Sequence, residues 1–223
     1  MEIKMSADFA AQIEAAKERL KTKPIDLDQI RREENEAYFK ADMKRAAHNQ
    51  LGERFAQCTF DNFKRNDNNK LAYGAARRLA GGFKRDKKGL ILAGPNGIGK
   101  NHLTAAMVNE LADQIKSAFY SNITKVKTKI CDAFGYSVEE AIESILSKDL
   151  ICINDLGAER DNDYAKELLF DLVDRLYEDK RCLVITTNLT DEEMFKRYGS
   201  RIVSRFFEMC DMVRYADYDH RVN

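Results

Sequence analysis

The sequence lacks several features that would assign it to a common class of protein. Its 37 Lys and Arg residues balance 37 Asp and Glu residues, so no overall positive charge points to nucleic acid, and any such contact must come from a local patch. No apolar run approaches the ~20 residues that span a bilayer, so we expect no membrane segment. The charged, amphipathic start of the chain does not resemble a secretory signal.

The cysteines and histidines do not form a recognisable catalytic or metal-binding pattern. No two of the five cysteines have the C-x-x-C spacing and no histidine partners them, which argues against a zinc site. Cys152 and Cys182 lie in apolar runs, and we expect both to be buried thiols of the core. An odd number of cysteines without a secretory signal fits a reducing cytoplasm. His48 and His220 have no partners at a catalytic spacing, so acid–base catalysis by histidine is not expected.

The most informative stretch follows a short apolar run, residues 89–93, and precedes a helical pattern from 103 to 111. It consists of Gly94, Pro95, Asn96, Gly97, Ile98, Gly99, Lys100 and Asn101. This matches the phosphate-binding pattern G-x-x-x-x-G-K, in which glycines bring backbone N–H groups to an anion and the helix adds its dipole. Lys100 can reach the outer phosphates. The pattern places Ser or Thr after the lysine as a magnesium ligand, but Asn101 stands there; His102, which follows, is expected to pack or cap.

Apolar runs alternate with helical patterns along the rest of the chain, which predicts a parallel α/β sheet with helices on both faces. The expected strands are 89–93, 118–120, 150–153 and 182–188, and the expected helices are 71–80, 103–111, 137–148 and 163–177. Residues 123–134 alternate Lys with Thr or Val, which favours a strand with a basic face, although a helix start stays possible. Because ligands of such sheets lie at the carboxyl ends of strands, we expect Asp155 and Asn188 beside the phosphate loop.

Hydrolysis of a nucleoside triphosphate requires a phosphate cradle, a magnesium ion, a positioned water and a positive charge for the transition state. The pair after the strand 150–153 is Asn154-Asp155, where Asp155 stands at the water-polarising position and an amide replaces the metal carboxylate. Asn188 can orient the water or contact the γ-phosphate. Magnesium would be held weakly or through water by Asn101, Asn154 and Asp155, so we expect retained ATP binding and slow hydrolysis. Alternatively, phosphates and water hold the ion well enough.

The first 50 residues are polar and helix-rich, unlike the rest of the chain. An apolar stripe runs through residues 9–20, and a second helical stretch extends from about Asp28 to Ala47. These helices either lie solvated on the main domain or bind a partner. We therefore divide the chain into a helical partner-binding extension, residues 1–50, and an ATP-binding domain, residues 51–223. Three phenylalanines within residues 54–63 indicate a loop pinned by aromatic side chains.

The order of the motifs resembles a known group. The motifs are Gly-x-x-x-x-Gly-Lys-x-His-Leu, then Asp-Leu-Gly-Ala-Glu, then Ile-Thr-Thr-Asn-Leu, then Gly-Ser-Arg-Ile-x-Ser-Arg-Phe. From Arg54 to Arg221 the chain is similar to the AAA+ helicase loaders of the DnaC/DnaI type and to the related IstB transposition helper ATPases. The resemblance implies a P-loop NTPase fold, with an AAA+ core and no large C-terminal lid, that binds ATP and Mg²⁺. The stretch 54–63 would lie near the nucleotide base.

The resemblance also implies roles for three arginines. Arg205 matches an arginine finger that reaches into a neighbouring subunit, Arg201 matches its basic companion, and Arg221 matches the arginine that senses the γ-phosphate within its own subunit. From the residues alone, a surface salt bridge is the favoured interpretation of each.

The implied activity is ATP-gated assembly on single-stranded DNA and delivery of a hexameric replicative helicase, which the helices of residues 1–50 would contact. The zinc module that some loaders carry is absent from this cysteine-free N-terminal region. Two alternatives stay open: a transposition helper ATPase, and a nucleotide-bound adaptor that does not hydrolyse ATP.

Overall fold

The computed structural model describes residues 14, 27–126, 137–158 and 163–215. Its backbone contacts divide the chain into two compact units, Met1–Phe39 and Lys40–Asn223. The boundary falls inside helix α2, Leu27–Ala56, which is kinked at Gly52 (φ 69°, ψ 167°). The helix therefore continues beyond its predicted end at Ala47, and the expectation of a loop from residue 54 is wrong for its first three residues. The predicted stripe at residues 9–20 lies outside the described residues, except for Glu14.

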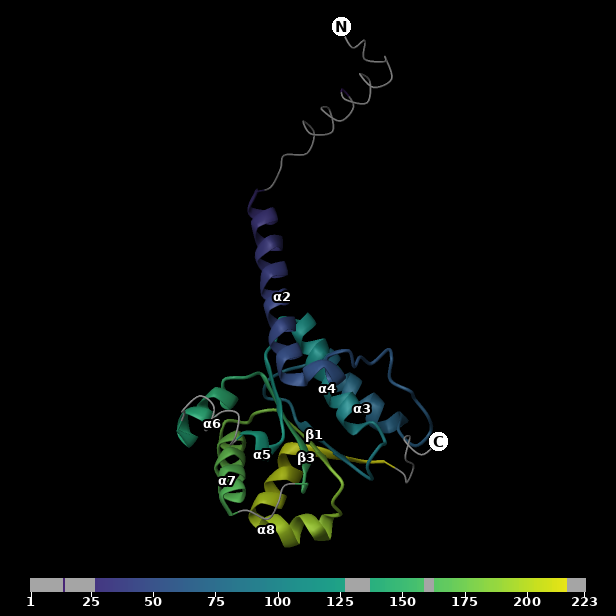
Figure 1. Ribbon diagram of the computed structural model, residues 1–223, viewed down its shortest axis with the longest axis vertical. Coiled ribbons are helices and arrows are strands. Elements are labelled where there is room, and N and C mark those ends of the chain that lie inside the picture. The colour runs from purple at the N-terminus through teal and green to yellow at the C-terminus, as the bar shows by residue number, and fades with distance from the viewer. Residues whose placement is uncertain (1–13, 15–26, 127–136, 159–162, 216–223) are drawn as a thin grey trace. The chain divides into compact units, whose positions relative to one another are not determined.

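The second unit contains a sheet of five parallel strands, as expected for this pattern of apolar runs (Figure 1). The strands are β1 Gly89–Ala93, β2 Ala118–Ser121, β3 Leu150–Leu156, β4 Leu183–Thr187 and β5 Cys210–Arg214, in the order β2-β3-β4-β1-β5. β5 was not predicted. It lies at an edge of the sheet, and Asp211 and Arg214 are exposed, so it has no continuous apolar run.

Helices connect the strands as parallel pairing requires. They are α3 Lys70–Gly81, α4 Lys100–Asp113, α5 Ile123–Val126, α6 Val138–Leu146, α7 Asp163–Glu178 and α8 Asp191–Met209. Ser137 and Glu140 form the predicted capping box at the start of α6, and Thr190 and Glu193 form another at α8. The strand favoured for residues 123–134 is wrong for α5, where the helical alternative holds; residues 127–134 lie outside the described part of the chain.

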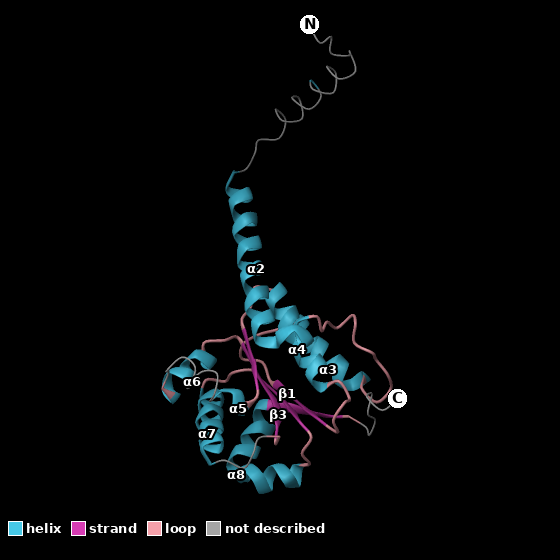
Figure 2. Ribbon diagram, viewed as in Figure 1, coloured by secondary structure: helices cyan, strands magenta, loops and turns pink. Residues whose placement is uncertain are grey.

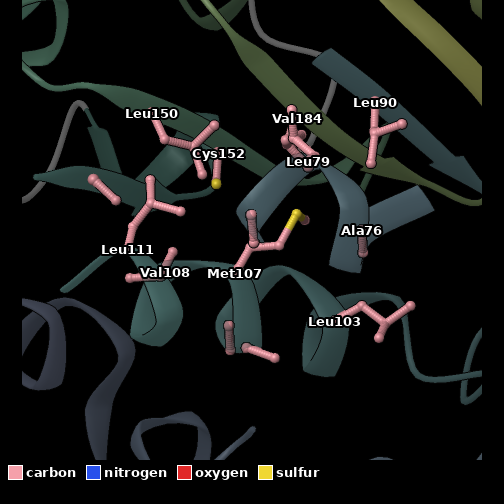
Figure 3. Close-up of a cluster of buried hydrophobic side chains, with 14 of the residues drawn as sticks. Ala76, Leu79, Leu90, Leu103, Met107, Val108, Leu111, Leu150, Cys152 and Val184 are labelled. Carbon is pink, nitrogen blue, oxygen red and sulfur yellow. The ribbon is translucent and has the colours of Figure 1, made fainter. Parts of the chain in front are cut away.

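Helices cover both faces of the sheet (Figure 2). The sheet separates two apolar clusters because successive strand residues point to opposite faces. One face packs against α3 and α4, as the side chains in Figure 3 show; its members include Ala76, Leu79, Leu90, Leu103, Met107, Leu111, Leu150, Cys152 and Val184. The other packs against α6, α7 and α8; its members include Ile91, Ile142, Ile151, Ile153, Leu172, Val173, Leu183, Ile185, Ile202 and Phe206. Each buried Leu, Ile, Val, Met or Phe side chain of these clusters contributes roughly 1.5–3 kcal/mol. The rigid sheet thus fixes the strand ends that carry the site.

Two predicted core thiols are confirmed, since Cys152 and Cys182 are both fully buried. Burial raises the pKa of the Cys182 thiol to about 12, so it stays protonated at neutral pH. Within the second unit, Gln50 of α2 bonds the outer edge of β2, donating to the Ala118 carbonyl (2.8 Å) and accepting from the Tyr120 N–H (2.9 Å). Over the described residues, no helix is long and apolar enough to cross a membrane.

Candidate nucleotide-phosphate site

The phosphate loop connects the carboxyl end of β1 to the start of α4, as the sequence predicts. Gly97 and Gly99 have φ values of 85° and 93°, which other residues adopt only with strain. Gly99 is the N-cap of α4 and supplies no side-chain hydrogen bond to the first turn, in contrast to the capped α6 and α8. The backbone N–H groups of this turn and the helix dipole are therefore directed at the loop, which is the arrangement that binds phosphate.

Lys100 places its positive charge inside the loop. Its ammonium group donates to the carbonyl oxygens of Gly94 and Pro95, both at 2.7 Å, and the residue is only 6% exposed. A buried ammonium strongly favours a nearby anion, because the low dielectric of the site strengthens the attraction. The phosphate contact of Lys100 stays a prediction, for which the ammonium group lies within the loop.

Asn101, the unusual residue of the motif, belongs to a closed set of hydrogen bonds with Asp155 and Thr186. Its Nδ2 donates to both carboxylate oxygens of Asp155 at 3.1 Å. Its Oδ1 accepts from the Thr186 hydroxyl at 2.9 Å, and that hydroxyl accepts from the Asp155 backbone N–H at 2.9 Å. We call these three residues the amide clamp. It joins α4 to the ends of β3 and β4 directly behind the phosphate loop.

A bulge in β3 carries Asp155 to the clamp. The register between β3 and β4 shifts between Ile153 and Leu156, and Asp155 has a φ of 52°, which is uncommon for a residue with a side chain. Strict alternation would give Asp155 the face of Ile153, which packs on the side of α6, α7 and α8. The bulge instead brings its carboxylate to Asn101 on α4. Such backbone strain costs about 1–3 kcal/mol and is concentrated at functional sites.

Asn154, which precedes Asp155, is almost completely buried. It is 4% exposed, and neither polar atom of its side chain has a hydrogen-bond partner among the described residues. An unsatisfied buried amide costs about 1–3 kcal/mol. Asn154 thus lies directly before Asp155 near the carboxyl end of β3, and its place in the site stays a prediction.

The donor set does not fit a magnesium ion. Magnesium takes oxygen ligands and is usually held by one or two carboxylates. Here Asn101 turns its NH₂ group toward the carboxylate and its oxygen toward Thr186, and Asn154 carries no charge. Asp155 is the one carboxylate of the clamp, and both of its oxygens already accept from Asn101. Across the described residues there is no group of three or more His, Cys, Asp or Glu side chains that could hold a metal.

The aromatic stretch after α2 packs on the phosphate loop. The Phe63 ring is in edge-to-face contact with His102 (centroids 5.2 Å apart), and a Cβ added to Gly99 would lie 2.7 Å from its Cε2. His102 Nε2 lies 3.0 Å from the Thr59 carbonyl oxygen. Asn109 of α4 donates to two carbonyls at the beginning of this stretch. Residues 57–63 therefore form the predicted aromatic-pinned loop, and His102 packs rather than standing free.

The remaining predicted residues lie elsewhere. Asn188 is exposed directly after β4. Arg205 and Arg201 of α8 both form ion pairs with Asp174 of α7, on the face of the sheet opposite α4, so within one subunit they are not brought to the loop. Arg221 lies outside the described residues.

Two further residues belong to this region. Thr186 belongs to the quoted Ile-Thr-Thr-Asn-Leu motif, but only the geometry of the bulge shows its role in the clamp. Tyr215 follows β5 and donates its backbone N–H to the Ala93 carbonyl at 2.9 Å, so the backbone and Cβ of this buried residue lie beside Gly94. Burial raises the pKa of the Tyr215 phenol well above its usual value.

The chain is similar in sequence to known ATP-binding and replication proteins. Residues 6–215 match the family model of the IstB-like ATP binding protein. The replicative helicase loader DnaC of Escherichia coli (strain K12) is 31% identical over 152 residues, which are 66% of this chain and 62% of that protein. DnaC of Buchnera aphidicola subsp. Acyrthosiphon pisum is 28% identical over 160 residues, which are 70% of this chain and 65% of that protein. The chain thus matches less than two thirds of the length of these relatives.

Solved structures show the same fold. A crystal structure of the DnaC helicase loader superposes with a TM-score of 0.64 and 22% identity, covering 74% of this chain and 100% of that chain. A crystal structure of DnaI gives a TM-score of 0.64 and 19% identity over 74% of this chain and 94% of that chain. The predicted AAA+ P-loop fold is confirmed by these similarities.

Proposed function

Because the chain belongs to the IstB-like ATP-binding family, we propose that it is an ATP-binding helicase loader that delivers a replicative helicase to single-stranded DNA. The observation that carries this proposal is the phosphate loop, residues 94–101, with the buried Lys100 inside it, in a chain related to DnaC. The cytoplasm, where the chromosome is replicated, is the proposed place of action.

In the proposed site, the loop backbone and Lys100 hold the phosphates, and the loop of residues 57–63 lies on the side of the base. Asp155 polarises the attacking water, and Asn188 orients that water or contacts the γ-phosphate. Because both oxygens of Asp155 already accept from Asn101, this carboxylate is less available to the attacking water, and we expect slow hydrolysis. A magnesium ion would be coordinated by the nucleotide and water, since the side chains do not fit it.

Self-assembly is proposed to complete the site. Arg205 would reach a neighbouring subunit's γ-phosphate as an arginine finger, with Arg201 beside it, and Arg221 would sense the γ-phosphate in its own subunit. Such a charge acts only in the assembled state, so hydrolysis would be coupled to assembly on single-stranded DNA.

The helicase is proposed to bind the N-terminal region, residues 1–50. In the first unit, α2 exposes Ile30, Tyr38 and Phe39, which are 42%, 69% and 54% exposed, and the two aromatic rings form an edge-to-face pair. Exposed large apolar side chains on a helix are typical of surfaces that dock into a groove of a partner.

Two observations favour alternatives. The matching family model is named for IstB, which fits a transposition helper, and the replaced magnesium ligands fit an adaptor that holds ATP without hydrolysing it. Measuring ATP turnover beside ATP binding separates the adaptor from the ATPase.

The test of the loader function is co-purification with a hexameric replicative helicase, with and without ATP, and in parallel with a transposase. We expect the helicase to be retained in an ATP-dependent manner, and a double Tyr38→Ala/Phe39→Ala variant to retain much less. Leu71→Ala, at an equally exposed apolar residue of α3, is the matched control and should behave as the wild type. Retention of the transposase alone would overturn the loader proposal.

A further inference from the structure

We propose that the amide clamp of Asn101, Asp155 and Thr186 takes the place of a divalent cation, so that this chain binds ATP equally well with and without magnesium. The inference rests on the proposed ATP-binding function and concerns how that site is held together. It assigns a role to Thr186, which neither the motif nor the family comparison provides.

The hydrogen bonds fix the direction of the Asn101 amide. The Thr186 hydroxyl accepts from the backbone N–H of Asp155, and its single proton points to Asn101 Oδ1 at 2.9 Å. The Asn101 NH₂ group therefore faces the Asp155 carboxylate, with both oxygens at 3.1 Å. The reversed amide would place its oxygen against two carboxylate oxygens, which repel it. The orientation is thus determined by the donors and acceptors around it.

In the clamp, the Asn101 NH₂ group stabilises the negative charge of the Asp155 carboxylate, as a bound cation otherwise would. Hydrogen bonds to an ionised acceptor are about twice as strong as neutral ones. An ion that bound Asp155 would have to displace the Asn101 NH₂ group from both oxygens and leave those donors without a partner. The neighbouring Asn154 is a neutral amide, so it adds no negative charge that would attract the ion and offset the loss of these hydrogen bonds. Side chains of the clamp therefore favour the metal-free state.

The charge of the phosphates has other partners in this site. The uncapped first turn of α4 directs backbone N–H groups and the positive end of the helix dipole at the loop. The Lys100 ammonium lies inside the same loop, at 2.7 Å from the Gly94 and Pro95 carbonyl oxygens. None of these groups requires a metal to act on an anion. ATP affinity is accordingly expected to be set by the loop rather than by the ion.

Thr186 is a positioning residue in this arrangement, and its neighbour provides a matched control. Both Thr186 and Thr187 are fully buried at the end of β4. The Thr187 hydroxyl also makes two hydrogen bonds, to the Leu156 carbonyl (2.7 Å) and from the Leu189 N–H (3.1 Å), but neither belongs to the clamp. Replacing either threonine by valine removes two hydrogen bonds of its hydroxyl. Only Thr186→Val removes a hydrogen bond to the side-chain amide of Asn101.

The experiment is a fluorescence titration of the full chain with an N-methylanthraniloyl ATP analogue, in EDTA and in excess magnesium. We expect the wild-type Kd to differ by less than about threefold between the two conditions. Asn101→Thr, which frees Asp155 and restores a hydroxyl, should bind at least ~tenfold more tightly with magnesium than without it. Thr186→Val should gain magnesium dependence in the same direction, and Thr187→Val should not.

The wild-type titration alone decides the proposal, so a variant that fails to fold does not leave it open. Saturable binding that strengthens by about threefold or more with magnesium overturns the clamp and leaves the ATP-binding function intact. No saturable binding in either condition overturns the ATP-binding function itself.

Discussion

Arg205 of α8 forms an ion pair with Asp174 of α7, and its guanidinium carbon lies 5.2 Å from the centre of the Tyr177 ring. Arg201 shares the same carboxylate at 2.6 Å. The residue proposed as the arginine finger is thus held within its own subunit. It must leave Asp174 to act on a neighbour, and Arg201 remains to pair that carboxylate when it does.

We predict that Arg205→Ala abolishes ATP-dependent self-association and lowers ATP turnover at least ~tenfold, because the transition-state charge in the neighbouring site is lost. The affinity of the monomeric variant for ATP should change by less than about twofold, since Arg205 does not lie at the phosphate loop of its own subunit. Light scattering after size exclusion and steady-state turnover measure the two effects. Arg175→Ala, which removes an α7 arginine paired with Glu139 and Glu143, is the control. Equal assembly and turnover in Arg205→Ala would show that the ion pair is only structural.

Gly99 is expected to tolerate no side chain. Its φ of 93° costs an alanine about 1 kcal/mol, and the new Cβ would lie 2.7 Å from Phe63, whose ring is stacked on Tyr73. We predict that Gly99→Ala lowers the free energy of unfolding by ~2–4 kcal/mol in urea denaturation and weakens ATP binding. Gly199→Ala has a similar φ of 78° with nothing within 4 Å, so it should cost only about 1 kcal/mol. Equal effects of the two substitutions would contradict the contact with Phe63.

Replacing Asn154 is expected to stabilise the protein, in contrast to replacing Gly99. Because its buried amide has no partner among the described residues, Asn154→Leu should raise the free energy of unfolding by ~1–2 kcal/mol without nucleotide. Asn69 is as deeply buried, but it donates to the Lys64 carbonyl and accepts from the Asn66 N–H. Asn69→Leu should therefore destabilise the protein in the same assay. If both leucine variants lose stability, Asn154 has a partner that the structure does not show.

The capping boxes predict part of the acid sensitivity. Hydrogen bonds from the Thr190 backbone N–H and hydroxyl lower the pKa of Glu193, and Ser137 lowers the pKa of Glu140 in the same way. A lowered pKa contributes stability above the ordinary carboxylate pKa, and this contribution is lost as the pH falls through the lowered value. The urea midpoint of Glu193→Gln should fall less steeply than that of the wild type between ~pH 6 and ~pH 3. Identical slopes would argue against this contribution.

The sequence predicts most of the sheet and the loop because their signals are local. A continuous apolar run indicates a buried strand, whichever strands pair with it. The motif of residues 94–101 likewise predicts a phosphate-binding turn between a strand and a helix without information from the rest of the fold. Four of the five strands were placed in this way. β5 was not predicted because Asp211 and Arg214 of this edge strand are exposed, and the charged residues leave no continuous apolar run.

The clamp could not be predicted because it depends on a shift in register. Asp155 reaches Asn101 only through the bulge at the end of β3, and no periodicity in the sequence marks that extra residue. The kink at Gly52 could not be predicted either, because no periodicity in the sequence shows that α2 continues across it to Ala56. The sequence shows Asn101 and Asn154 as departures from a motif. Only the structure shows that the Asn101 amide is fully hydrogen-bonded and that the Asn154 amide has no partner within the part of the chain that is described.

The most direct test of the central claim, that the loop of residues 94–101 binds ATP, is equilibrium binding of ATP to the wild type and to Lys100→Ala by isothermal titration calorimetry. We predict saturable binding by the wild type and at least ~tenfold weaker binding by the variant, since a charged hydrogen bond to phosphate is lost. Lys70→Ala, at an exposed lysine paired with Asp67, should bind as the wild type does. A wild-type chain that shows no saturable ATP binding, or a Lys100→Ala variant with unchanged affinity, would contradict the claim.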